Sequence, residues 1–350
     1  MRVFNFHRLF LFFLIAIVQN CYLNPLFYID FKDKKDSSLL LQNLVTAGLV
    51  SSIISGANSS PVLLDWVGRT APIIGNSVTF ANGLFVSVST GATPVMTSPD
   101  GINWTARTAT NSTYSSVTYG NGLFVAVTNT GGGSLITSPD GITWTNVNSG
   151  IGSQFQSVVF ANGQFVAVGR TGTNRVKTSP DGITWTARTA AEANEWISIA
   201  YGNGLYVAIT PTGGTNAGTN LVMTSPDGIA WTARTQSLDN SWSSVAFGNG
   251  LFVAVAAFGA TDQIMTSPDG INWITRTAVN GSWRSIAYGN GIFVAVGSGT
   301  TPQIMTSRDG MNWTLNSSPF SSGLWNGVTY ANGLFVAVGS GTNRVMTASF

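Results

Sequence analysis

Residues 97–108 read TSPDGINWTART, and this short segment returns along the chain with few changes. The other copies read TSPDGITWT from residue 137, TSPDGITWTART from 178, TSPDGIAWTART from 224, TSPDGINWITRT from 266 and TSRDGMNWT from 306. A chain that repeats one segment in this way repeats either an active site or a scaffold. The spacing of the copies helps to decide between them, because a fixed period is typical of a repeat architecture.

Asn-Gly pairs mark the same period, at residues 82, 121, 162, 203, 249, 290 and 332. Successive pairs lie 39 to 46 residues apart, which predicts seven units from about residue 62 onward. Each unit holds four short segments of strand composition, for example SSVTYG, LFVAV, IMTS and WTART, with turn residues between them. Asn-Gly favours a type I′ hairpin, because both turn residues need positive φ. Four antiparallel strands in about forty residues is the size of a propeller blade.

The repeated Ser-Pro-Asp-Gly-x-x-Trp segment resembles the Asp-box, or BNR repeat, of sialidase-like β-propellers, which usually reads Ser-x-Asp-x-Gly-x-x-Trp. Every copy here has one residue fewer between Asp and Gly, so we expect a tighter turn. In that family the box joins the third and fourth strands of a blade. The resemblance therefore implies an innermost strand A before Asn-Gly, followed by strands B, C and an outermost strand D.

The strand count predicts how the array closes. Strands A, B and C occur seven times, but only six D strands follow a box; their tryptophans are Trp104, Trp144, Trp185, Trp231, Trp273 and Trp313. Upstream, Trp66 and Arg69 have the same spacing as Trp104 and Arg107, and the chain ends after a C strand. We therefore predict an all-β, seven-bladed propeller over residues 61–350 whose N-terminal strand completes the last blade and removes exposed sheet edges.

The box aspartates are expected to be structural. Their carboxylates and the preceding serines can bond to backbone groups of their own turn, the glycine takes the left-handed conformation, and the tryptophan is buried between sheets. Copies on the rim of different blades cannot converge on one substrate; calcium ligation is the functional alternative. The residues are Asp100, Asp140, Asp181, Asp227, Asp269 and Asp309.

Function is expected where the repeat breaks. Strand parity places the irregular B-to-C and D-to-A loops on one face, called here the variable face, and loops on a rigid scaffold often bind ligands. Six aromatic residues at the start of strand A are predicted to surround the channel mouth there and stack on a sugar or peptide. The alternative is that their rings pack between blades. They are Tyr114, Phe155, Trp196, Trp242, Trp283 and Trp325, with Gly75 in the first unit.

Residue types limit the chemistry. The single histidine and single cysteine, His7 and Cys21, lie near the N-terminus, which excludes a zinc site of the His/Cys kind and Ser-His or Cys-His catalysis; no cofactor is expected. The full residue set of a true sialidase cannot be placed. A glycosidase would need Glu195 with Asp239 or Asp262 on the variable face. We expect a non-catalytic binding protein, with Glu195 and Asp239 as further candidate ligand contacts; a glycosidase or an assembly scaffold for a membrane complex is the alternative.

The N-terminus predicts export. Arg2 and Arg8 flank the start of an apolar run from Leu9 to Val18, which is too short to span a bilayer and typical of a signal peptide over residues 1–20. Cys21 resembles the lipidated cysteine of bacterial lipoproteins, although Gln19 and Asn20 are larger than usual; an ordinary signal peptide is the alternative. Residues 21–60 would then form a tether.

Charge limits the partners. Without the two leader arginines, 14 basic and 14 acidic residues remain, which gives no support for nucleic-acid binding. We expect a monomeric outer-membrane or cell-surface lipoprotein, or alternatively a periplasmic one. It would touch the membrane only through its lipid and bind a glycan or protein partner.

Overall fold

The computed structural model describes residues 61–349, except 131–133, 149–151, 153, 173, 213–218, 259–261, 300–302 and 342–343. They belong to a compact unit that runs from Asn58 to Phe350. The regular elements of these residues are β-strands. Among the described residues, no helix has the length and apolar character needed to span a membrane. The predicted signal peptide, Cys21 and the tether lie outside the described residues.

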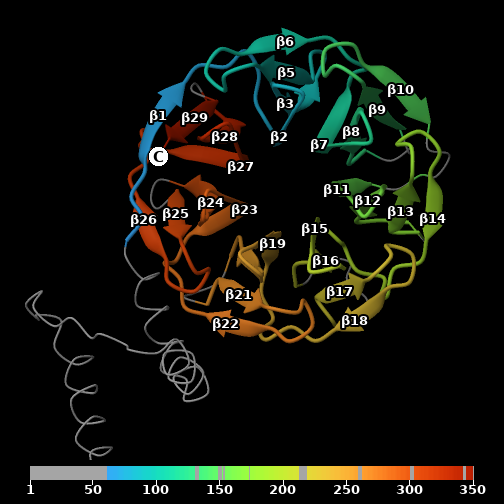
Figure 1. Ribbon diagram of the computed structural model, residues 1–350, viewed down its shortest axis with the longest axis vertical. Helices are drawn as coiled ribbons and strands as arrows, with labels where there is room; N and C mark the ends of the chain where they lie inside the picture. Colours follow the sequence, from blue (N-terminus) through green and yellow to red (C-terminus); the bar gives the residue numbers. More distant parts are fainter. Residues whose placement is uncertain are drawn as a thin grey trace, which may run out of the picture. The chain divides into compact units, whose positions relative to one another are not determined.

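Antiparallel sheets surround a common centre (Figure 1). The first contains β2 (Ser77–Ala81), β3 (Leu84–Val88), β5 (Val95–Ser98) and β6 (Thr105–Arg107). The second contains β7 (Ser112–Gly120), β8 (Leu123–Thr128), β9 (Ser134–Ser138) and β10 (Thr145–Asn148), with the short β4 (Thr90–Gly91) beside β7. In each sheet the first long strand lies nearest the centre and the last lies at the rim.

Three more four-stranded sheets follow the same order. They are β11 (Phe155–Ala161), β12 (Gln164–Gly169), β13 (Val176–Ser179) and β14 (Thr186–Arg188); then β15 (Ser198–Gly202), β16 (Leu205–Ile209), β17 (Val222–Ser225) and β18 (Thr232–Arg234); then β19 (Trp242–Gly248), β20 (Leu251–Ala256), β21 (Ile264–Ser267) and β22 (Ile274–Arg276).

The remaining strands form one eight-stranded sheet with two halves. One half is β23 (Ser282–Gly289), β24 (Ile292–Gly299), β25 (Ile304–Ser307) and β26 (Thr314–Asn316); the other is β27 (Gly323–Ala331), β28 (Leu334–Ser340), β29 (Val345–Ser349) and β1 (Asp65–Arg69). Only two residue pairs join the halves, Ser298 with Leu324 and Gly299 with Gly323. The described chain is therefore an all-β array of four-stranded antiparallel units.

The Asn-Gly turns have the backbone conformation that the sequence predicts. Each asparagine has φ between 48° and 51°, and each following glycine has φ between 73° and 80°. Both central residues of every hairpin therefore lie in the left-handed region, which only asparagine and glycine enter at low cost. The type I′ prediction is confirmed at all seven positions.

The repeated Ser-Pro-Asp-Gly turn is held by its own side chains. Asp100 Oδ1 accepts hydrogen bonds from the backbone N–H groups of Ile102 and Asn103, both at 2.8 Å, and from the Ser98 hydroxyl at 2.9 Å. Trp104 Nε1 donates to the carbonyl of Gly101 at 2.9 Å. The other five copies repeat these contacts. Hydrogen bonds from Ala230 and Ile229 accordingly lower the pKa of Asp227, so this carboxylate stabilises its turn as an anion.

The N-terminal strand completes the last sheet. Strand β1 pairs antiparallel with β29, from Asp65 opposite Ser349 to Arg69 opposite Val345. Arg69 Nε donates to Thr347 Oγ1 at 3.1 Å, and Arg107 makes the same contact with Thr97 at 2.9 Å within one sheet. Trp66 follows no repeated turn, and its Nε1 has no hydrogen-bond partner in the described part of the chain. The prediction that the strand with Trp66 and Arg69 completes the last sheet is confirmed.

Asn316 receives the incoming N-terminal segment. It occupies the position that holds arginine in five other outer strands, at residues 69, 107, 188, 234 and 276. Its Oδ1 accepts from the Leu64 N–H at 2.7 Å, and its Nδ2 donates to the Val62 carbonyl at 3.1 Å. The side chain is buried. This departure from the repeat therefore fixes the chain just before β1.

We predict that Asn316→Ala lowers the free energy of unfolding by about 1–3 kcal/mol, because the Leu64 N–H loses its partner and the Val62 carbonyl keeps only the Thr306 hydroxyl. Arg276→Ala is the matched control, since it removes the equivalent side chain where no strand arrives, and it should cost less than about 1 kcal/mol. Chemical denaturation measures both. Equal losses in the two variants would contradict a docking role for Asn316.

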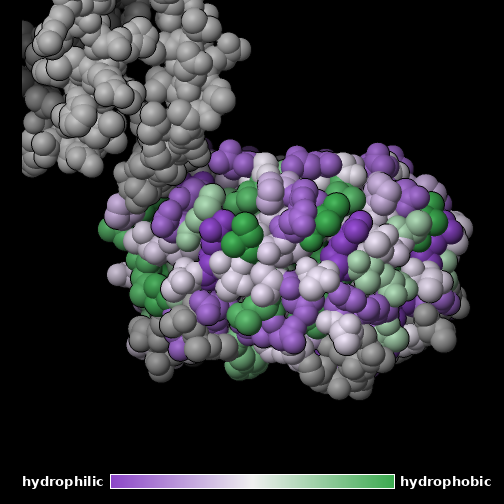
Figure 2. Space-filling model, turned by 90° about the horizontal axis from the view of Figure 1, so that it is seen from below, coloured by the Kyte–Doolittle hydropathy of each residue, from purple (hydrophilic) through white to green (hydrophobic). Residues whose placement is uncertain are grey.

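The hydrophobic core lies between neighbouring sheets. One cluster joins Val86 and Val88 of β3 to Tyr114 and Phe124 of the next sheet. Five more clusters each join the next pair of neighbours along the chain. A last cluster joins β28 to β2 and β3, which closes the circle. The outer surface seen edge-on in Figure 2 mixes hydrophilic and hydrophobic side chains.

Lys177 is a cation inside this core. It is 1% exposed, and its Nζ lies 4.9 Å from the centre of the Phe155 ring. Burial lowers its pKa from 10.5 to about 8. The other six units hold an apolar residue here, namely Met96, Ile136, Met223, Met265, Met305 and Met346. The lysine therefore destabilises an interface that the repeat otherwise fills with hydrocarbon or thioether.

We predict that Lys177→Met raises the free energy of unfolding at pH 7 by about 1–3 kcal/mol. The folded-state pKa lies below that of the unfolded chain, so the wild type gains stability as the pH rises from about 8 to 10.5. The advantage of Lys177→Met should therefore shrink over that range. Denaturant titrations at several pH values measure this, with Met223→Lys as the reverse variant. A pH-independent difference would contradict the account.

Candidate functional site

The six aromatic side chains at the start of the innermost strands are buried. Tyr114, Phe155, Trp196, Trp242, Trp283 and Trp325 are each between 0% and 4% exposed and belong to the clusters between sheets. Trp242 Nε1 donates to the Leu238 carbonyl at 3.1 Å, and Trp196 and Trp283 make the same bond to the residue four positions earlier. The expectation that these rings offer exposed faces at the channel mouth is therefore wrong. The rings instead pack between neighbouring sheets, as the alternative interpretation predicts.

A β-bulge explains why most of these aromatic rings are buried and do not face the channel. The pairing register shifts directly after five of these aromatic residues, for example between Trp283 and Ser285. The intervening residue, Arg284 in this case, has no partner on the neighbouring strand. A bulge re-aims the side chains around it. The residue after each aromatic therefore faces the channel, while the aromatic itself turns into the core.

The channel is thus lined by the position that follows the expected one. This position, called here the channel row, holds Asn76, Ser115, Gln156, Ile197, Ser243, Arg284 and Asn326. Four of these side chains also link sheets, since each donates to a carbonyl of the next sheet. Ser115 Oγ, for example, lies 2.7 Å from the Phe155 carbonyl oxygen. Gln156, Ile197 and Arg284 have no such bond to the next sheet among the described residues.

A row of serines lies one residue further along. Ser77, Ser116, Ser157, Ser198, Ser244 and Ser285 each accept a hydrogen bond from a backbone N–H of the next innermost strand, at 3.1–3.4 Å. Gly327 takes the seventh position, where a Cβ would lie 3.1 Å from Ser77 Cα. These hydroxyls hold the innermost strands together and surround a cavity of about 140 Å³.

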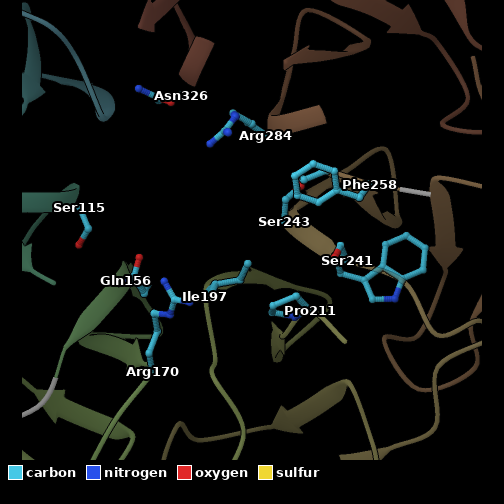
Figure 3. A pocket seen from close by; sticks show the side chains of 12 residues that line it. Ser115, Gln156, Arg170, Ile197, Pro211, Ser241, Ser243, Phe258, Arg284 and Asn326 are labelled. Carbon is cyan, nitrogen blue, oxygen red and sulfur yellow. The ribbon is translucent and has the colours of Figure 1, made fainter. Parts of the chain in front are cut away.

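A wider cavity of about 410 Å³ opens above the channel row. Arg170, Pro211 and Phe258 from B-to-C loops and Ser241 from a D-to-A loop line it, together with most of the channel row (Figure 3). Phe258 is 66% exposed. The cavity therefore lies on the variable face. The sequence predicts a site on this face, and Trp242 of the six predicted aromatic residues also lies in the wall. Arg170, Pro211 and Phe258 were not predicted, because the wall combines loops of three units.

Two arginines point into the space of this mouth (Figure 3). Arg170 pairs with Glu195, whose Oε2 lies 2.6 Å from Arg170 Nη2 and 3.0 Å from its Nε. Arg284 Nε donates to Ser298 Oγ at 3.2 Å. No ion pair involves Arg284 in the described part of the chain. Arg284 is exposed to solvent in the channel, although its partial burial lowers the pKa of the guanidinium.

The side chains of Glu195 and Asp239, expected on this face, have partners of their own, whereas Asp262 is contacted through its backbone. Glu195 is 8% exposed and held by Arg170. Asp239 accepts a hydrogen bond from Gln236 within its own loop. The backbone carbonyl of Asp262 accepts from Asn240 Nδ2 at 2.8 Å. Glu195 is thus the ion-pair partner of Arg170, which lines the cavity.

Comparison with known proteins places the fold. Solved structures that resemble the chain include YCF48 from Cyanidioschyzon merolae, with 15% identity and a TM-score of 0.60 over 81% of this chain and 98% of that one. A YCF48 bound to D1 peptide has 16% identity and a TM-score of 0.62 over 83% and 100%. The chain has the β-propeller fold.

A third propeller of this kind is an enzyme. A catalytically inactive virginiamycin B lyase from Staphylococcus aureus, with quinupristin, has 10% identity and a TM-score of 0.70 over 82% of this chain and 99% of that one. At such low identity these likenesses show the fold alone. No protein-family model matches the chain, and no curated protein matches it.

Proposed function

We propose that this propeller is a non-catalytic binding protein that takes a protein segment at the mouth of its channel. The observation that carries the proposal is the cavity of about 410 Å³ on the variable face, with an exposed phenylalanine and an arginine without an ion-pair partner among the described residues. Ligand sites in proteins commonly have volumes of about 300–1,000 Å³. The cavity is large enough for a few side chains of an extended segment.

The lining favours a peptide over a glycan. Ile197, Pro211 and Phe258 supply apolar surface, while Gln156 and Ser241 supply hydrogen-bonding groups. Such a mixture suits a segment with both apolar and polar side chains. A glycan site typically offers several flat aromatic faces, and here all six predicted aromatic rings are buried. Phe258 is the one aromatic side chain with a large exposed area on this described lining.

The glycosidase alternative loses its main support. A two-carboxylate mechanism needs one carboxyl group as proton donor and another as base or nucleophile. Glu195 accepts two hydrogen bonds from the Arg170 guanidinium, which fix the orientation of its carboxylate. Such a carboxylate suits a structural ion pair better than proton donation.

The similar structures are consistent with this proposal. A YCF48 is bound to a D1 peptide, and the virginiamycin B lyase structure contains quinupristin. The YCF48 complex supports a protein ligand for this chain. A role as an assembly scaffold for a membrane complex is the alternative.

We further propose the wider setting of the protein. Counting the eight-stranded sheet as two blades gives a seven-bladed propeller, whose repeated turns are a shortened form of the Asp-box. Cleavage after residue 20 and lipidation of Cys21 would make it an exported lipoprotein of the outer membrane or cell surface, with the periplasm as the alternative. We also propose that it is a monomer.

An array of short synthetic peptides of varied sequence, probed with the purified chain, tests the binding function. A Phe258→Ser, Ile197→Ser variant should bind about tenfold more weakly or worse, because it removes apolar area from the mouth. Serine is native to the channel row at residues 115 and 243, so the fold should tolerate it.

The matched control changes two isoleucines on the opposite face. Ile183 and Ile229 are 55% and 44% exposed in the repeated turns, and Ile183→Ser with Ile229→Ser should leave peptide binding unchanged. A glycan array is probed in parallel. Binding to glycans but not peptides, or equal peptide binding by the wild type and the mouth variant, would contradict the proposal.

A further inference from the structure

We propose that Arg284 binds a carboxylate of the protein ligand at the junction of the wide and narrow cavities. This inference rests on the proposed peptide-binding function and specifies the chemistry of its anchor. The carboxylate can belong to the C-terminus of a chain or to an aspartate or glutamate side chain, and both sources present the same planar anion.

Arg284 is the single charged member of the channel row. The other six positions of that row carry asparagine, serine, glutamine or isoleucine. Strand pairing places five of the seven, including Arg284, at the same bulge, and the other four of these bulges hold no arginine, so the scaffold does not need one there. The charge of Arg284 is therefore not required by the fold, and we attribute it to ligand binding.

The guanidinium is held in place with free donors. Its Nε donates to Ser298 Oγ, and Ser298 in turn donates to Ser282 Oγ at 3.0 Å. Among the described residues neither terminal nitrogen of Arg284 has a hydrogen-bond partner. An arginine fixed at Nε still presents two parallel N–H groups to an incoming carboxylate.

Charge balance favours a monoanion. Two arginines, Arg170 and Arg284, line the mouth, and the charge of Arg170 is balanced by its ion pair with Glu195. The described lining therefore has one uncompensated positive charge. A carboxylate neutralises it, whereas a phosphate, which carries nearly two negative charges, would leave an excess.

The shape of the channel favours the tip of a segment. Arg284 lines both the cavity of about 410 Å³ and the deeper one of about 140 Å³. The deeper cavity is bounded by the serine row, whose hydroxyls already accept bonds from neighbouring strands. A chain end or an acidic side chain can reach the guanidinium from the wide mouth, while Phe258 and Pro211 contact the residues that precede it.

The test uses three forms of each peptide on the array with the full chain: a free C-terminus, an amidated C-terminus, and an amidated C-terminus with a glutamate near the end. The wild type should bind at least one carboxylate-bearing form about tenfold to a hundredfold more tightly than the amide without glutamate. A preference for the first form identifies a chain terminus, and a preference for the third identifies a side chain.

Arg284→Gln should abolish that preference while leaving residual peptide binding, and Gln156 shows that the channel row accommodates glutamine. The control is Arg308→Pro, which removes a positive charge at the opposite face and restores the residue found in the other five repeated turns. It should behave as the wild type. Thermal melting checks that both variants are folded.

The outcomes separate the two proposals. Peptide binding that is equal for acid and amide forms, or unchanged in Arg284→Gln, overturns the carboxylate anchor and leaves the peptide-binding function standing. Absence of binding to any peptide form overturns both.

Discussion

The contact between neighbouring sheets is the constraint on which this structure depends. A single four-stranded sheet cannot bury its own faces, so every hydrophobic cluster is built from two adjacent sheets, including the last with the first. The aromatic residue at the head of each innermost strand seals most of these contacts, and in the first unit Gly75 leaves room for Val338 of the last sheet. Pairing of β1 with β29 then removes the edges that an open array would expose.

The residues that pack between sheets and the residues that line the channel are neighbours in the sequence. Each aromatic must turn into the core, and the bulge that follows turns its successor into the channel. The repeat can therefore keep Trp242 or Trp283 as packing residues while the next position varies between serine, isoleucine and arginine without disturbing the core. The side chains of the channel row therefore differ in charge and polarity while the strands that hold them keep the same structure. Arg170 and Phe258, from loops of the variable face, line the same cavity.

Much of the fold follows from local chemistry. Asn-Gly predicts its hairpins because the backbone conformation demands those residues. The spacing of Trp66 and Arg69 predicts the partner of β29, because Arg69 makes the threonine contact that the other outer-strand arginines make. The repeated turn is predictable for the same reason, since Asp100 bonds to its own neighbours. In each case the deciding contacts lie within a few residues of one turn or between neighbouring strands of one sheet.

The site was harder to predict because a bulge has no compositional mark. Trp283 lies five positions before Tyr288, an odd number that places the two on opposite faces of a regular strand. Both pack toward the preceding sheet, since Tyr288 lies against Gly248 and Trp283 joins the cluster of Val253 and Val255. The pairing of Glu195 with Arg170 depends on loops from two units and escapes local analysis as well.

Residue-level hydroxyl-radical footprinting of the folded chain tests this account most directly. Tryptophan is intrinsically more reactive than phenylalanine, yet Trp196, Trp242, Trp283 and Trp325 are at most 1% exposed and Phe258 is 66% exposed. The account predicts rapid oxidation of Phe258 and protection of the four tryptophans until the chain unfolds. Oxidation of those tryptophans in the native state, at rates equal to or above that of Phe258, would contradict it and would show that these rings are exposed at the channel surface.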